Sequence, residues 1–268
     1  MLGAALLHAA WNAILKSGAD PLLDTALVAL SGSALCVPLL LIVAPPASAS
    51  WPYMAISVSI HVGYYATLAA AYRAGDLSHG YPIMRGTAPL LVAVGTIGMF
   101  GEALSGTAWA GVLLICAGVL SLGMIGGGAT RKATAFALVN ALIIAVYTVS
   151  DATGARVSGG VERYVVWVFF LMGLPFGLIV IALRRGAFVR HAARFWWRGL
   201  GGATLSGLAY AIVLWAMTRA PVAVVAALRE TSVVFAALIG AWLLKEGHIA
   251  RRVASALVVV AGVVALKL

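Results

Sequence analysis

The chain has 268 residues, of which 63% are hydrophobic and 10% are charged. Its mean hydropathy of +1.05 is too high for a fold with a water-exposed polar surface, so the composition excludes an ordinary water-soluble protein. The formal net charge of +10 does not indicate nucleic-acid binding, because the basic residues lie at the ends of apolar runs and do not gather on one polar surface.

Ten apolar runs, bounded by Gly, Pro or charged residues, predict ten transmembrane helices. They cover residues 2–16, 24–44, 53–74, 79–100, 106–126, 133–152, 163–183, 199–218, 222–244 and 250–267. Lipid offers no partner for a free backbone amide, so we expect an all-α integral membrane fold. The longest connection, residues 184–198, is interpreted as a loop that contacts anionic lipids, since it holds five of the 18 Lys and Arg residues.

An internal repeat relates the two halves of the chain. A shift of 144 residues aligns 82–122 with 226–266 without a gap, and two charged pairs match in that frame, Arg85 with Arg229 and Glu102 with Glu246. The pattern predicts a duplicated five-helix unit, with halves at 1–127 and 128–268. Because five is odd, the second copy must enter the membrane from the opposite side, which gives an inverted repeat.

The charged residues of the connections are distributed unequally between the two sides of the membrane. The connections after the odd-numbered helices hold most of the Lys and Arg residues, whereas residues 44–52 hold no charge at all. By the positive-inside rule the Arg-rich side is cytoplasmic, which places both termini outside.

Several short motifs give the chain a family resemblance. They are HAAWNAILK at residues 8–16, RAGDLS at 73–78, GE at 101–102, RETS at 229–232 and KE at 245–246. Together with the ten helices in two inverted halves, the chain resembles the EamA-type transporters of the drug/metabolite transporter superfamily. The resemblance implies a multi-pass carrier of the bacterial inner membrane, frequently an exporter of amino acids or other small metabolites. Members usually have both termini in the cytoplasm, so the charge distribution here departs from the family.

Two polar stripes are candidates for a substrate site. His8, Asn12 and Lys16 lie four residues apart on the first helix, with Trp11 beside them. A shift of 135 residues places Tyr147 and Asp151 of the sixth helix on Asn12 and Lys16. In an inverted repeat the stripes are expected to face each other near the pseudo-twofold axis, where such carriers bind substrate. The alternative is that Lys16 and Asp151 reach toward the lipid headgroups.

Charged residues inside the apolar runs form a second group of candidates. Arg85 lies between Pro82 and Pro89, and Arg229 and Glu230 occupy the repeat-related place. A guanidinium in lipid is costly, so these residues are expected to face the protein interior. There they would either bind a substrate carboxylate or form an internal ion pair that fixes the helices.

Histidine and aromatic residues complete the candidate set. His79 and Tyr81 follow Asp76, and a histidine near a carboxylate can couple transport to protons, although an interfacial histidine without a role is an equal alternative. Rings that could stack on a substrate are those of Tyr65, Tyr210 and Trp215. Glu102 and Glu246 are expected to pair with basic residues and hold helix ends.

The preferred function is a secondary transporter that works by alternating access. A membrane-embedded enzyme acting on lipid or isoprenoid substrates is the alternative, but the eight acidic residues show no metal-ligand spacing and no catalytic triad is evident. A channel would need rings of like residues. We therefore expect a small-molecule substrate, no metal, no cofactor and no nucleic acid, and leave a homodimer open.

Overall fold

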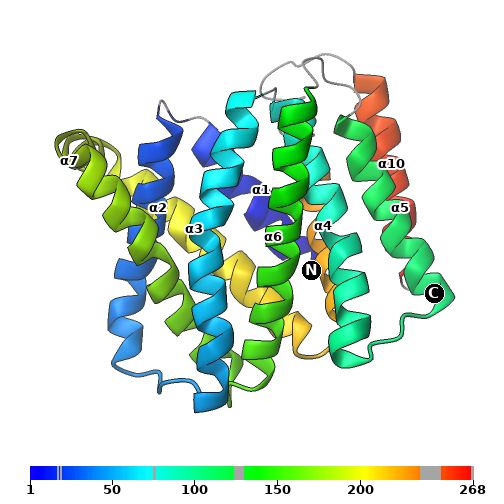
Figure 1. The fold of residues 1–268 in the computed structure, drawn as a ribbon, viewed down its shortest axis with the longest axis horizontal. Coiled ribbons are helices and arrows are strands. Elements are labelled where there is room, and N and C mark those ends of the chain that lie inside the picture. Colours follow the sequence, from blue (N-terminus) through cyan, green and yellow to red (C-terminus); the bar gives the residue numbers. More distant parts are fainter. Residues whose placement is uncertain (17, 19, 75–76, 124–129, 236–248, 267–268) are drawn as a thin grey trace. The chain divides into compact units, whose positions relative to one another are not determined.

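The computed structural model describes the chain except for residues 17, 19, 75–76, 124–129, 236–248 and 267–268. The side chains of Lys16, Ala66, Ala69, Tyr72, Arg73 and residues 77–79 and 249–252 also lie outside the description. All elements of the described residues are helical (Figure 1): α1 Leu2–Lys16, α2 Pro21–Leu40, the 3-10 turn η1 Ser48–Ser50, α3 Trp51–Ala74, α4 Leu77–Phe100, α5 Gly106–Gly123, α6 Arg131–Arg156, α7 Val161–Met217, α8 Val222–Arg229 and α10 Ile249–Ala265.

Several of these helices are long and apolar enough to cross a membrane. Among the described residues they are α2, residues Gly80–Phe100 of α4, α5, α6 and α7. The expected all-α membrane class is therefore confirmed for this part of the chain. The count of ten spans stays a prediction.

The chain forms two compact units. Unit 1 contains Met1–Ala5, Gly63–Val149 and Arg219–Leu268, and unit 2 contains Leu6–Val62 and Ser150–Thr218. Each unit takes residues from both predicted halves, so the halves themselves stay a prediction.

In unit 2, α2 begins three residues earlier than its apolar run indicates. Asp20 is the N-cap residue, and its side chain accepts hydrogen bonds from the backbone N–H groups of Leu22 and Leu23 at 3.1 and 3.2 Å. Pro21 at the first helical position fits the same start, since its missing N–H would have no partner there.

The connection at residues 184–198 is largely helical rather than an irregular loop, and kinks near both of its ends separate it from the flanking helices. Helix α7 runs from Val161 to Met217, with non-helical backbone only at Arg184 and Phe195. The segment holds Gly186 but no proline, and it buries Phe188 against the core that α2 contributes. A buried apolar anchor together with helix-favouring residues explains why the backbone stays helical.

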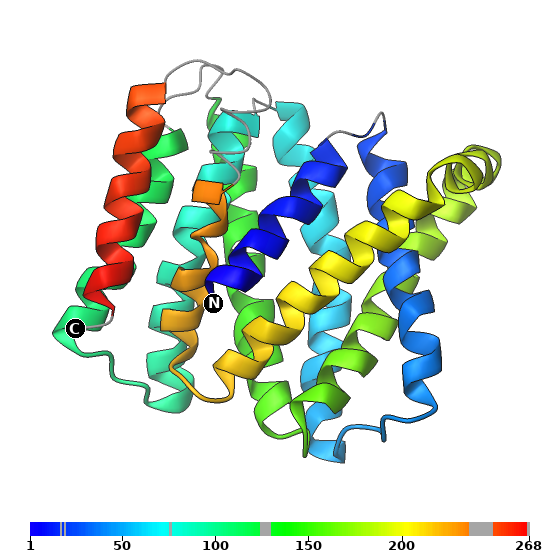
Figure 2. The same cartoon turned by 180° about the vertical axis from the view of Figure 1, so that it is seen from behind.

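Helix α2 packs against α7 on both sides of the bend in α7 (Figure 2). A methyl group on Gly202 would lie 2.8 Å from Val28 Cγ2, and one on Gly199 would lie 2.7 Å from Leu27 Cγ. Helices in lipid associate through such direct packing, because burial of apolar side chains gives no net gain there.

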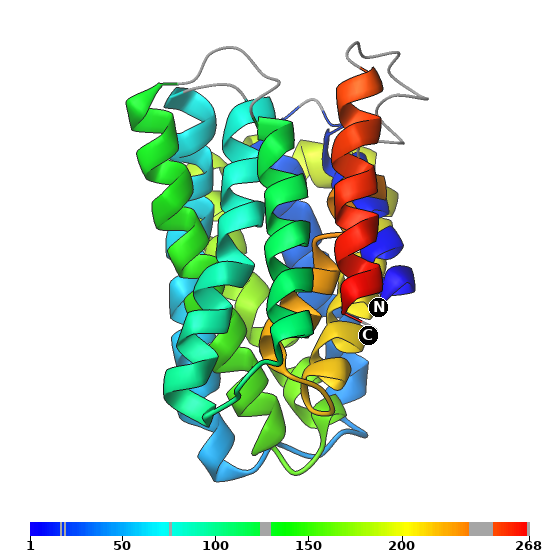
Figure 3. The same ribbon diagram turned by 90° about the vertical axis from the view of Figure 1, so that its right-hand side faces the viewer.

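In unit 1, α5 and α10 lie side by side (Figures 1 and 3). A Cβ on Gly262 would lie 2.8 Å from the carbonyl oxygen of Gly111, and one on Gly118 would lie 3.0 Å from that of Ser255. The contacts pair earlier residues of α5 with later residues of α10, so the two helices are antiparallel. Gly111, Gly118 and Gly262 therefore allow the two helices to approach closely.

Glu102, in the connection between α4 and α5, holds the start of α8. Its Oε2 accepts a hydrogen bond from the backbone N–H of Val222 at 3.0 Å. The expectation that Glu102 holds a helix end is confirmed, while Glu246 lies outside the described residues.

We expect Glu102→Ala to lower the free energy of unfolding by about 0.5 to 2 kcal/mol, the usual cost of a lost helix cap. Thermal unfolding of the purified protein in detergent measures the change. Glu102→Gln is the matched control, because its amide oxygen can still accept from Val222 and the stability should stay close to that of the original chain. Equal losses in both variants would contradict the capping role.

Candidate functional site

Three charged side chains meet inside unit 1. Arg85 of α4 places Nε 2.7 Å from Oε2 of Glu230, and Nε of Arg229 donates to Oε1 of the same carboxylate at 3.4 Å. The side chains are 6%, 7% and 0% exposed for Arg85, Arg229 and Glu230. We refer to these residues as the Arg–Glu–Arg cluster.

The cluster forms where the ninth apolar run changes its backbone conformation. The sequence predicts one helix over 222–244, but α8 ends at Arg229 and residues 230–231 form a turn before helical structure resumes at 232. The backbone N–H groups of Glu230 and Thr231 bond the carbonyls of Ala227 and Leu228, and the Thr231 hydroxyl also donates to Leu228 at 2.7 Å. These tight local bonds compete with the α-helical pattern, so the prediction of an uninterrupted helix was wrong here.

Tyrosine side chains surround the cluster. Tyr81 lies one turn before Arg85 on α4, and Tyr81, Tyr64 and Tyr147 all interact electrostatically with the Arg85 guanidinium. The rings of Tyr64 and Tyr147 meet edge to face at 6.1 Å, and those of Tyr64 and Tyr65 meet at 5.2 Å. The region therefore combines a cationic group with several amphipathic rings.

An asparagine joins the helices that carry these tyrosines. Asn140 of α6 is fully buried, and its Nδ2 donates to the backbone carbonyl of Tyr64 at 2.9 Å and to Thr67 Oγ1 at 2.8 Å. Both partners belong to α3. The amide thus fixes α6 against the part of α3 that lies in unit 1.

A second polar cluster lies within unit 2. Oδ1 of Asp151 accepts a hydrogen bond from Tyr164 at 2.8 Å, and Oδ2 accepts one from Tyr210. Ser57 and His61 of α3 interact with the same carboxylate. We refer to these five residues as the Asp151 cluster.

A family model described as the EamA-like transporter family matches residues 131–268, slightly more than half of the chain. The chain belongs to the EamA-like transporter family. Members of this family are transporters rather than enzymes, so the family supports a membrane transporter and gives no support to the enzyme alternative. The resemblance stated from the motifs is confirmed.

Solved structures also resemble this EamA-like chain, with 24 matching chains. One, described only as "Crystal structure of protein", aligns with a TM-score of 0.78 at 20% sequence identity and covers 98% of this chain and 93% of its own. At that identity the likeness shows the fold alone. A search of curated proteins found no match.

The first polar stripe of this EamA-like transporter lies on α1 as predicted. Its members bond within their own helix, since Trp11 Nε1 donates to His8 Nδ1 at 3.1 Å and Asn12 Nδ2 donates to the His8 carbonyl at 2.7 Å. The side chains of Lys16 and His79 lie outside the description. That the two polar stripes face each other stays a prediction.

The structure brings some of the predicted site residues together and leaves others apart. Arg85, Arg229 and Glu230 meet, and they realise the internal ion pair that was weighed as an alternative. Tyr65, Tyr81 and Tyr147 lie in the same unit, whereas Asp151 and Tyr210 meet in unit 2. Trp215 is 49% exposed on α7.

Sequence reasoning missed three members of the Asp151 cluster, namely Ser57, His61 and Tyr164. It also missed a buried pair in unit 2, in which His191 Nε2 lies 3.0 Å from Asp24 Oδ1. His61 and Asp24 do stand inside apolar runs. A titratable residue in such a position is itself a signal for a functional or paired site, and it could have found both.

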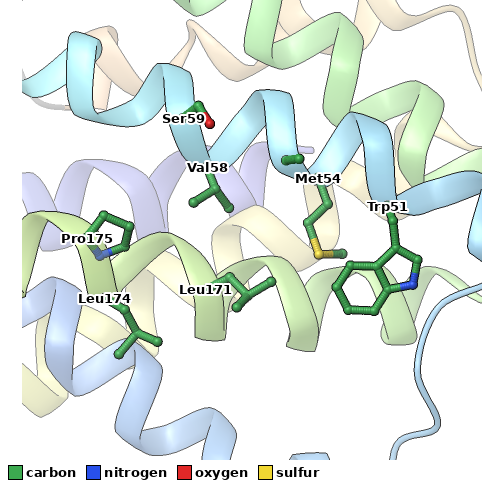
Figure 4. Close-up of a pocket in the computed structure, with 8 residues that line it drawn as sticks. Trp51, Met54, Val58, Ser59, Leu171, Leu174 and Pro175 are labelled. Atoms are coloured by element: carbon green, nitrogen blue, oxygen red, sulfur yellow. The ribbon is translucent and has the colours of Figure 1, made fainter.

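An apolar pocket lies between α3 and α7 in unit 2 (Figure 4). Its lining consists of Trp51, Met54, Ala55, Val58, Ser59, Leu171, Leu174 and Pro175. None of the predicted site residues belongs to it. With almost no polar groups to orient a ligand, it does not have the character of a site for a charged metabolite.

Proposed function

We propose that this EamA-like transporter is a secondary transporter that exports small organic metabolites, such as amino acids, across the bacterial inner membrane by alternating access. We further propose that the carboxylate of the substrate binds at the Arg–Glu–Arg cluster. Export and the inner membrane follow from the family resemblance, whereas the substrate class follows from the charges of the cluster.

The observation that carries this proposal is the meeting of two buried guanidinium groups at one carboxylate. Arg85 and Arg229 share one carboxylate, that of Glu230, so the three groups have a net charge of +1. A substrate carboxylate would neutralise this charge, and a guanidinium can bind such a group through two parallel hydrogen bonds.

The surroundings of the cluster also suit a small organic anion or zwitterion. The turn after α8 interrupts a membrane-depth helix, and discontinuous helices commonly line the substrate sites of carriers. Tyr64, Tyr65, Tyr81 and Tyr147 supply rings and hydroxyl groups in the same unit. All of the predicted substrate contacts remain predictions, namely Trp11, Asn12, Lys16, Tyr65, His79, Tyr81, Arg85, Tyr147, Asp151, Tyr210, Trp215, Arg229 and Glu230.

Ten spans arranged as two inverted five-helix repeats are part of this proposal, and the packing of α5 against α10 supports it. Gly118 approaches Val259, and Gly262 approaches Ile115. Gly118 and Gly262 are 144 residues apart, as are Ile115 and Val259. Each contact is therefore the image of the other, as expected at a twofold axis.

The transport proposal can be tested in proteoliposomes with radiolabelled amino acids and organic acids. We expect saturable uptake of one carboxylate class, stimulated by the same unlabelled compound inside the vesicles, because exchange is a property of carriers. Absence of exchange across the panel by folded protein would contradict the proposal.

The role of the cluster can be tested with Arg229→Gln, which keeps the pair of Arg85 and Glu230. We expect KM for the carboxylate substrate to rise about tenfold to hundredfold, the effect of losing a charge-assisted hydrogen bond worth about 1.5 to 3 kcal/mol. Arg185→Gln is the control with the same change of charge at an exposed position. Equal KM values in the two variants would place the substrate elsewhere.

A further inference from the structure

The Asp151 cluster belongs to unit 2, whereas the Arg–Glu–Arg cluster belongs to unit 1. Asp151 is 1% exposed and Tyr164 is fully buried, whereas Tyr210 is half-buried. Asp151 forms no ion pair with a lysine or arginine in the described part of the chain, although a buried carboxylate without such a partner is costly. Such a group needs a cation, and the geometry limits which cation fits.

The carboxylate is surrounded by its own hydrogen-bond donors. Tyr164 and Tyr210 already occupy both oxygens as donors. Tyr164 also packs directly on Gly154 of α6, where an added Cβ would lie 2.7 Å from the Tyr164 Cζ atom. A hard metal ion would need several oxygen ligands, and the described residues contain no group of three His, Cys, Asp or Glu side chains that could hold one. A proton needs no ligand besides the carboxylate itself.

We propose that Asp151 is the proton-binding residue of this chain and that its protonation is coupled to substrate transport. The coupling rests on the transport function proposed above. This assignment gives Asp151 and Tyr210 a role different from the substrate contact that the sequence predicts for them.

The hydrogen bonds of the cluster can serve both protonation states. In the charged state the carboxylate accepts from Tyr164 and Tyr210. When a proton arrives, the new carboxyl O–H can donate to the Tyr210 oxygen, and the Tyr210 hydroxyl hydrogen rotates to another acceptor. A hydroxyl group both donates and accepts, so Tyr210 can bond to the carboxyl group in either protonation state. Tyr210 is the half-buried member, so we place the entry of the proton on its side.

Two helices place side chains against Asp151. The titratable His61 and the hydroxyl of Ser57 face it from α3, and Tyr164 and Tyr210 face it from α7. Nδ1 of His61 lies 2.7 Å from the Ser57 carbonyl oxygen. Because a carbonyl only accepts, Nδ1 carries a hydrogen, and Nε2 is the nitrogen that can gain or lose a proton. The experiment must therefore separate a proton on the carboxyl group from one on the imidazole.

Infrared difference spectroscopy of the purified full chain in lipid nanodiscs, recorded across a pH titration, makes this separation without a substrate. We expect the carbonyl stretch of a protonated carboxyl group to appear at low pH and to be lost in Asp151→Asn. The stretch should persist in Asp20→Asn, which removes a partly exposed carboxylate. Persistence of the full band in Asp151→Asn, or a pH-dependent signal that only His61→Gln removes, would overturn the assignment.

Tyr210→Phe provides a second variant in case Asp151→Asn does not fold. It removes one hydrogen bond to the carboxyl group, so the band should change frequency while remaining present. A band that is identical in frequency to that of the original chain would show that the titrating carboxyl is not the partner of Tyr210.

Coupling itself is tested in the proteoliposomes used for exchange. For one-to-one coupling, an imposed gradient of one pH unit should drive about tenfold accumulation of substrate, since both ratios correspond to the same free energy. Asp151→Asn should retain exchange and show no accumulation. Exchange that ignores the gradient in the original chain would overturn the coupling and leave the transport proposal intact, whereas absence of all exchange would count against transport itself.

Discussion

Replacing Glu230 with glutamine is expected to lower the free energy of unfolding by about 3 to 5 kcal/mol, the usual cost of removing one partner from a buried ion pair. Glu230 is fully buried and is shared by Arg85 and Arg229. Without its charge two guanidinium groups remain together in a low-dielectric interior. Thermal or denaturant unfolding of the purified protein in detergent measures the loss.

Glu162→Gln provides the control for this variant, since it makes the same chemical change at an exposed position of α7. The double variant Arg85→Gln with Glu230→Gln should recover part of the loss, because it removes a charge of each sign. A double-mutant cycle then gives the coupling energy of the pair. Stabilities of Glu230→Gln and Glu162→Gln that agree, with a coupling energy near zero, would show that the pair does not stabilise the fold.

The sequence located this cluster only in part. The cost of a guanidinium in lipid correctly placed Arg85 and Arg229 inside the protein, since both are buried in the structure. The sequence alone does not distinguish an internal ion pair from an open ligand site. That distinction depends on how α4 and the end of α8 approach each other. The two interpretations are also compatible, because in the proposed function a guanidinium of the cluster binds the substrate carboxylate.

The helices themselves were largely predictable, because in lipid each apolar run must satisfy its own backbone. The exceptions have local causes. At Glu230 and Thr231 short-range hydrogen bonds end α8, and across residues 184–198 the burial of Phe188 maintains a helix. A hydropathy pattern predicts neither effect. The end of α8 depends on a side-chain hydroxyl group, and the helix around Phe188 depends on packing against a neighbouring helix.

The Asp151 cluster was not predictable as a unit. Its members come from α3, α6 and α7, and no spacing within one helix relates Tyr164 or Tyr210 to Asp151. Only the packing within unit 2 brings their hydroxyl groups to the carboxylate. Among the members that the sequence did not predict, His61 was the one whose position inside an apolar run indicated a buried polar site.

The closest approach of α5 and α10 leads to the second large effect. We expect Gly262→Ala to lower the free energy of unfolding by about 1 to 3 kcal/mol, the range found for overpacking. The new methyl group would lie 2.8 Å from the Gly111 carbonyl oxygen and 2.7 Å from Ile115 Cγ1. A backbone carbonyl within a helix cannot move away as a flexible side chain can, so the two helices must separate.

Gly98→Ala in α4 is the matched control, because a Cβ there meets no atom within 4 Å, and alanine is the better helix former by about 1 kcal/mol. This variant should be as stable as the original chain or more stable. Gly118→Ala tests the twofold relation, since its Cβ would lie 2.7 Å from Val259 Cγ2 and 3.0 Å from the Ser255 carbonyl oxygen. Losses of similar size at Gly118 and Gly262 would support repeat-related positions at one interface. A large loss at only one of them would mean that the two glycines share a sequence register without sharing a structural role.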